Sequence, residues 1–107
     1  MKKIQKQIRH GDVLLNPIDD LPKNAVRVRR RKIITLAEGE LTGHSHTIEA
    51  PAKDVETFES GGELYLKVNT PQLLRHQEHS ELTVEPGLYV VRRQVEVWMD
   101  EVRQVAD

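Results

Sequence analysis

Four of the five histidines in this chain fall into two short pairs with the spacing of metal ligands. His44 and His46 stand two residues apart, and on a β-strand such side chains project from one face about 7 Å apart. His76 and His79 stand three residues apart, a spacing at which side chains converge on a helical turn or in a tight loop. Imidazole nitrogens bind divalent transition metals. The two pairs therefore predict one shared metal site, provided that the chain brings them together.

The chain contains no cysteine, so a metal here would be held by nitrogen and oxygen ligands. Zinc is the first expectation, with nickel, iron or manganese as alternatives. Glu78 lies inside the second pair and Glu49 follows the first, and each could serve as a ligand or as a catalytic base. Three bound imidazoles with one open position would acidify a bound water, as in a metal-dependent hydrolase or another metalloenzyme. Four imidazoles that close the coordination shell would make the metal structural.

The first pair and its surroundings resemble the metal-binding motif of the cupin family in Gly39, His44, His46 and Glu49. Cupins present a His-x-His, a glutamate a few residues on and a more distant histidine. The resemblance implies a small double-stranded β-helix barrel with a metal at these side chains. Here the glutamate follows one or two residues earlier than in cupins. No histidine follows Pro86 and Gly87, where the second cupin motif would place one.

A basic run offers an alternative function. On a single strand, Arg27, Arg29 and Arg31 would line one face and could contact phosphates. The chain would then be a non-enzymatic binding module, with a structural metal or none, that contacts nucleic acid or protein. The competing interpretation is a solvated edge strand whose charges oppose aggregation. We favour this second interpretation, because only four aromatic residues are present to form a stacking platform.

Length and charge limit the class of protein. A chain of 107 residues suits one compact domain, with residues 1–9 as an N-terminal arm that could be flexible. The net charge of −1 argues against a globally basic nucleic-acid binder or a basic membrane anchor. No apolar run approaches the roughly 18 residues that a membrane helix needs. No secretory signal is recognisable either, so we expect a cytoplasmic protein.

The residue types favour strands over helices. Valine, isoleucine and threonine number 12, 6 and 6, against 5 alanines, and β-branched side chains pack well on pleated surfaces. Ser60-Gly61-Gly62 between two alternating segments predicts a hairpin. We expect an all-β domain, a small barrel or sandwich, with its strands in the following segments: 13–15, 26–36, 41–49, 55–59, 63–68, 81–84 and 88–99.

The last of these predicted strands, Leu88–Met99, carries the one tryptophan of the chain, Trp98. A small β domain has a limited core of its own, and tryptophan is enriched at protein interfaces. We therefore expect a homodimer in which this strand and Trp98 form the contact.

Overall fold

The computed structural model describes residues 6–38, 44–93, 95–98 and 101–104, and side chains no further than Arg93. Its described residues form strands, turns and loops, so the expected all-β class is confirmed. None of them forms a helix that is long and apolar enough to cross a membrane. The strands are β1 (Ile8–His10), β2 (Val13–Ile18), β3 (Val26–Arg27), β4 (Ile33–Glu38), β5 (Ser45–Glu49), β6 (Val55–Ser60), β7 (Glu63–Val68), β8 (Gln72–Arg75), β9 (Leu82–Val84), β10 (Gly87–Arg93), β11 (Val95–Trp98) and β12 (Glu101–Gln104).

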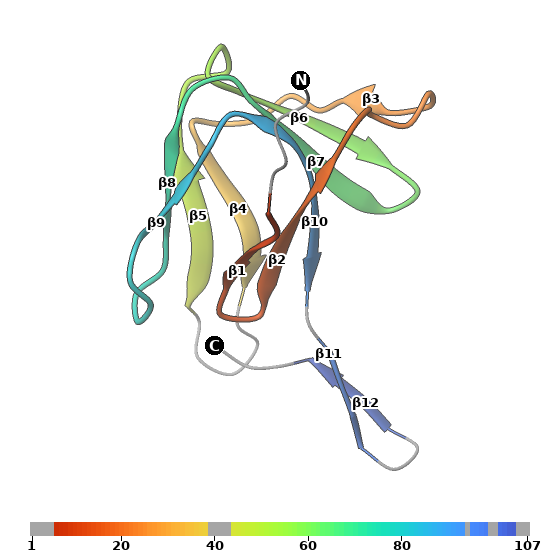
Figure 1. Ribbon diagram of the computed structural model, residues 1–107, viewed down its shortest axis with the longest axis vertical. Coiled ribbons are helices and arrows are strands. Elements are labelled where there is room, and N and C mark those ends of the chain that lie inside the picture. Colours follow the sequence, from red (N-terminus) through yellow and green to blue (C-terminus); the bar gives the residue numbers. More distant parts are fainter. Residues whose placement is uncertain (1–5, 39–43, 94, 99–100, 105–107) are drawn as a thin grey trace.

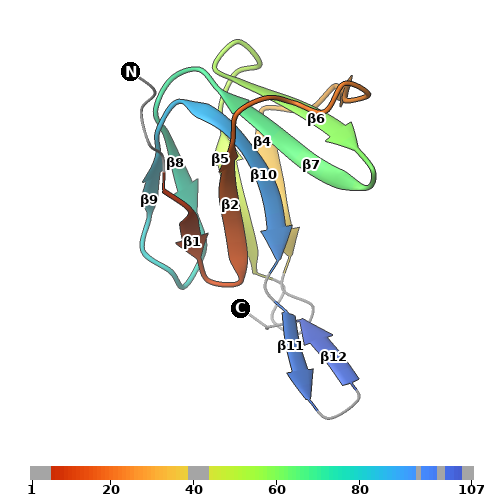
Figure 2. The ribbon, with the colours of Figure 1, turned by 45° about the vertical axis from the view of Figure 1, so that its right-hand side comes forward.

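Two antiparallel sheets form an open sandwich (Figures 1 and 2). One has six strands in the order β1-β2-β10-β7-β6-β3, and the other has four in the order β4-β5-β8-β9. Fully buried side chains from both sheets, among them Leu15, Ile48, Leu66 and Leu74, form one core. Each such side chain contributes about 1.5–3 kcal/mol through the apolar surface that it removes from water. The sandwich therefore supports both sheets on a common apolar layer.

The hairpin of β6 and β7 forms as the sequence predicts. Gly61 and Gly62 have φ values of 58° and 78°, a left-handed conformation that glycine adopts without a steric penalty. The register pairs Ser60 with Glu63 and continues to Val55 with Val68. Local turn chemistry was therefore sufficient to specify this unit.

The prediction of a single strand over residues 26–36 was wrong. β3 ends at Arg27 and pairs with β6 in the six-stranded sheet, whereas β4 begins at Ile33 and pairs with β5 in the other sheet. Residues 28–32 carry the chain between the two sheets. Apolar residues at both ends of the segment led to the prediction of one strand. Periodicity alone does not reveal that the two ends join different sheets.

Two other strand boundaries also differ from expectation. β2 does not stop before Asn16-Pro17 but continues to Ile18. β1 pairs with β2 only as far as Leu15, and β10 pairs along the other side, so Pro17 lies where one side of β2 has no neighbour in the sheet. The long strand expected over 88–99 is divided into β10, which ends at Arg93, and β11, which pairs with β12 in a separate two-stranded sheet.

Two sequence expectations fall on parts of the chain that the structure does not describe. Gly39 lies outside the described residues, as does the side chain of Trp98. The homodimer contact through Trp98 therefore stays a prediction.

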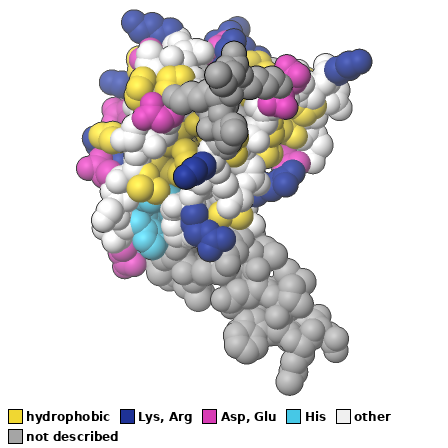
Figure 3. Space-filling view, in the orientation of Figure 1, with side chains coloured by type: hydrophobic (Ala, Val, Ile, Leu, Met, Phe, Trp, Pro, Cys, Tyr) yellow, Lys and Arg dark blue, Asp and Glu magenta, His cyan; other side chains and the backbone are white. Residues whose placement is uncertain are grey.

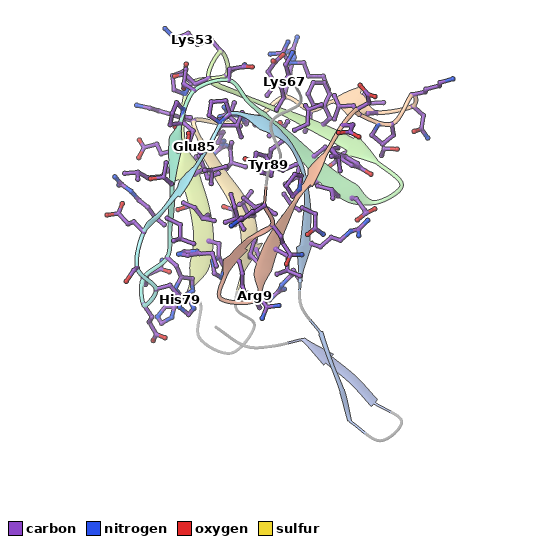
Figure 4. The ribbon with its side chains drawn as sticks, in the orientation of Figure 1. Arg9, Lys53, Lys67, His79, Glu85 and Tyr89 are labelled. Carbon is purple, nitrogen blue, oxygen red and sulfur yellow. The ribbon has the colours of Figure 1, made fainter. Side chains whose placement is uncertain are left out.

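The buried side chain of Tyr89, on β10, forms a hydrogen bond with the connection between β9 and β10 (Figure 4). The Tyr89 hydroxyl donates a hydrogen bond of 2.8 Å to the carbonyl oxygen of Glu85. Burial, and secondarily the negative charge of Glu85, raise the pKa of Tyr89. The phenol therefore stays protonated and keeps its role as donor.

Candidate metal centre

The histidines meet where the two sheets come together at one end of the sandwich. His10 ends β1, His46 lies on β5 just after His44, and His76 and His79 follow β8 in the loop to β9. Figure 4 shows His79 at this lower end. The pairing of β5 with β8 brings the two sequence-predicted pairs together. The fifth histidine, His10, arrives from the other sheet.

All five imidazoles belong to one cluster. The centroids of the His10, His46 and His79 rings are 5.0, 5.5 and 5.8 Å apart in the three possible pairs. His76 lies 4.4 Å from His46 and 4.5 Å from His79, and His44 lies 5.5 Å from His76. Imidazoles that share one zinc ion at a Zn–N distance of about 2.0–2.1 Å have ring centroids about 4.5–5.2 Å apart. The cluster therefore has nearly the spacing of a set of metal ligands.

The outer nitrogens of His10 and His46 each lie beside an oxygen atom. His10 Nε2 forms a hydrogen bond of 2.8 Å with the carbonyl oxygen of Ser80, and His46 Nε2 lies 3.2 Å from Asp12 Oδ1. A carbonyl oxygen only accepts, so His10 Nε2 carries the proton. Histidines that bind a metal characteristically donate the second ring N–H to a carbonyl or carboxylate in this way.

The inner nitrogens of the same two rings face each other. His10 Nδ1 and His46 Nδ1 are 2.9 Å apart, and both residues are at least 97% buried, with 3% and 1% of their surface exposed. The His10 ring, with its proton on Nε2, presents the Nδ1 lone pair to His46 Nδ1. Either a hydrogen bond from the Nδ1–H group of His46 or a metal ion bound by both nitrogens accommodates this approach. Two nitrogens bound to one zinc ion are separated by about 2.9–3.4 Å.

The remaining two histidines of the cluster are arranged differently. His76 Nδ1 accepts a hydrogen bond of 3.0 Å from the backbone N–H of Glu78, so its neutral ring carries the proton on Nε2. His44 Nδ1 lies 3.4 Å from Glu78 Oε1, and the side chains of His44 and Glu78 are 27% and 61% exposed. His44 and Glu78 therefore occupy the side of the cluster that faces solvent. Figure 3 shows histidine side chains at the surface near the lower end, with an acidic side chain below them.

The donor atoms do not yet converge on a single point. Among the described residues, no three histidine, aspartate or glutamate side chains are placed so that they could hold a metal ion as they stand. The His10–His46 pair faces inward, whereas His76 is turned to the Glu78 amide. Completing a coordination shell would require ring rotations within the cluster.

The other predicted carboxylate does not join the cluster. On β5 the side chains of His46 and Ile48 point inward, so Glu49 points outward, where it is exposed. Glu49 Oε1 lies 3.7 Å from Lys32 Nζ. Glu78 is thus the predicted base that the structure brings to the histidines.

Three residues of the site were not foreseen from the sequence: His10, Asp12 and Arg93. A two-residue turn of Gly11 and Asp12 joins β1 to β2, pairs His10 with Val13, and has Gly11 at φ 61°. The signal in the sequence was His-Gly-Asp, in which such a turn holds a histidine and a carboxylate side by side. Arg93 carries no comparable signal, because it reaches Asp12 only through the pairing of β10 with β2.

The arginines of the alternative function do not share one strand. Arg27 is on β3 with its guanidinium 3.6 Å from Glu56, whereas Arg29 and Arg31 are exposed in the segment that follows. A pocket of about 490 Å³ is lined by Arg27, Arg29 and Arg30 together with Glu56. Arg30 is engaged with the backbone and donates to five carbonyl oxygens, those of Arg31, Lys32, Ala50, Pro51 and Val55.

Comparison with known proteins bears on the family and not on the chemistry. No curated protein and no solved structure matches the chain. A family profile described as a domain of unknown function, DUF8820, matches residues 9–94. The match includes every histidine of the cluster together with Asp12 and Arg93. The chain therefore belongs to the DUF8820 family of domains of unknown function.

Proposed function

We propose that this protein binds one divalent transition metal through its histidine cluster, with zinc as the first candidate and nickel, iron or manganese as alternatives. The observation that carries the proposal is the approach of His10 Nδ1 to His46 Nδ1 at 2.9 Å while both Nε2 atoms face acceptors. A metal ion bound by both nitrogens satisfies this arrangement without burying an imidazolium.

We rank His10, His46 and His79 first as ligands, because the Nδ1 atoms of His10 and His46 face each other and the His79 ring lies beside both. His44 and His76 complete the group on the solvent side. Binding through His76 requires release of the Glu78 amide from its Nδ1 or loss of the Nε2 proton, so His76 ranks last.

We further propose that the site acts on substrates as a metal-dependent hydrolase. Three neutral imidazoles would leave a bound metal its full positive charge. That charge would make a water at an open position acidic enough to supply hydroxide near neutral pH. Glu78 is placed to accept a proton on that side, with an oxygen 3.4 Å from His44. If four imidazoles closed the shell, the metal would be structural instead.

The direct test is metal content and affinity. The protein should be purified without a polyhistidine tag, stripped with a chelator, and titrated with zinc and with cobalt as a spectroscopic probe. We expect about one equivalent of bound metal and a cobalt spectrum with imidazole ligation. A content below about a tenth of an equivalent, with no saturable cobalt binding, would contradict the proposal.

The second candidate is nucleic-acid binding at the pocket lined by Arg27, Arg29 and Arg30. We expect only weak binding that disappears with added salt, because Glu56 lies beside Arg27 and Arg30 is occupied by backbone carbonyls. Mobility shifts with single-stranded and duplex DNA and RNA at low and physiological salt measure this. Micromolar binding at physiological salt that an Arg29→Glu, Arg31→Glu double variant abolishes would establish this candidate instead.

A further inference from the structure

A buried carboxylate joins the histidine cluster to the end of β10. Asp12 is 1% exposed, and its Oδ1 lies 3.2 Å from His46 Nε2. Its Oδ2 accepts two hydrogen bonds from Arg93, of 3.0 Å from Nε and 2.6 Å from Nη2. The carboxylate thus presents Oδ2 to the guanidinium of Arg93 and Oδ1 to the imidazole of His46.

We infer that Asp12, held by Arg93, is a positioning residue that orients His46 for metal binding. This inference rests on the proposed metal-binding function. The carboxylate acts through His46 in two ways: it restricts the rotation of the ring and increases the electron density at Nδ1. The metal-binding nitrogen is then the one that faces His10.

Arg93 holds the side chain of Asp12 in its buried position. A buried carboxylate is costly without a partner, and the Arg93 guanidinium supplies two hydrogen bonds and a positive charge. The register places Arg93 opposite Val13, the neighbour of Asp12, so the β10–β2 pairing brings guanidinium and carboxylate together. The end of β10 therefore contributes to the site although it supplies no ligand of its own.

A purely structural ion pair is the competing interpretation, and the test must separate the two. Cobalt(II) is the probe, with affinity measured by competition and ligand geometry by the visible absorption spectrum. We expect Asp12→Asn to weaken cobalt binding by about 10–100-fold and to shift the spectrum. We expect Arg93→Gln to weaken binding as well, and Arg93→Lys to restore most of the affinity because it keeps the cation.

The matched control is the ion pair of Arg92, which precedes Arg93 on β10, with Glu63 on β7. Arg92 Nε pairs with Glu63 Oε2 at 2.9 Å on the exposed face, so Glu63→Gln removes an ion pair without touching the cluster. It should leave cobalt affinity and spectrum unchanged. Circular dichroism of each metal-free variant verifies folding, and if Asp12→Asn does not fold, the comparison of Arg93→Gln with Arg93→Lys decides.

The outcomes distinguish this inference from the proposed function. Folded Asp12→Asn protein with wild-type cobalt affinity and spectrum would overturn the positioning role and leave metal binding intact. The same conclusion follows if Arg93→Gln and Arg93→Lys both behave like Glu63→Gln. Wild-type protein that binds no cobalt would instead overturn the proposed function and, with it, this inference.

Discussion

Replacing His10 with alanine is expected to weaken metal binding by more than about 100-fold, as much as replacing His46. The two Nδ1 atoms face each other at 2.9 Å, so each variant removes one of the pair of nitrogens that would hold the ion. Competition titration with zinc and cobalt measures both losses. Equal effects are expected although His10 stands 34 positions before His44 in the sequence.

The matched control for this experiment is His44→Ala. His44 lies on the solvent side, where its ring centroid is 5.5 Å from that of His76 and its Nδ1 is 3.4 Å from Glu78 Oε1. We expect a loss of about tenfold or less for this variant. Wild-type affinity in the His10→Ala protein, together with large losses for His44, His46, His76 and His79, would show that the four sequence-predicted histidines form the site without His10.

Replacing Arg30 with alanine is expected to lower the free energy of unfolding by about 2–4 kcal/mol, the second large effect. The guanidinium donates to carbonyl oxygens that include Ala50 at 2.8 Å and Val55 at 2.6 Å. These hydrogen bonds connect the segment between β3 and β4 to the residues from the end of β5 to the start of β6. Partial burial lowers the pKa of Arg30. An arginine guanidinium keeps its charge in proteins, so the donors remain in place.

Arg29→Ala provides the comparison for this measurement. Arg29 is exposed beside Arg30, so its removal should change the free energy of unfolding by less than about 0.5 kcal/mol. Urea denaturation followed by circular dichroism measures both variants. Equal stability of the two would show that the carbonyl contacts of Arg30 contribute nothing to folding. Cobalt affinity should be unchanged in both, because neither residue belongs to the histidine cluster.

Some of the fold could be predicted because it depends on neighbours along the chain. The β6–β7 hairpin follows from Ser60-Gly61-Gly62, whose two glycines adopt positive φ, and from the alternation that buries Leu66 and Val68. The class of fold followed from the excess of β-branched residues. The spacing of His44 and His46 likewise predicted that the two side chains lie close together, and the rings of both lie beside His76, although His44 precedes β5.

Long-range pairing accounts for what the sequence could not predict. The run from Val26 to Leu36 has the residue types of one strand, yet its two ends join different sheets, because periodicity describes an element and not its partners. The strand expected over residues 13–15 continues through Pro17 to Ile18. Pro17 is tolerated there because β1 pairs with β2 only as far as Leu15. Such outcomes depend on which strands lie side by side.

By itself, the sequence determined the all-β class, the local hairpin and the two histidine pairs, since each depends on residue type and short spacing. Only the tertiary structure decided that His10 completes the cluster, that Asp12 and Arg93 stand behind His46, and that Glu49 points away. The physical reason is that a metal centre is assembled by directions and distances between strands. His10 and Arg93 are far apart in the sequence, and the pairing of β1 and β10 with β2 brings both to Asp12, while His46 joins them from β5 in the other sheet.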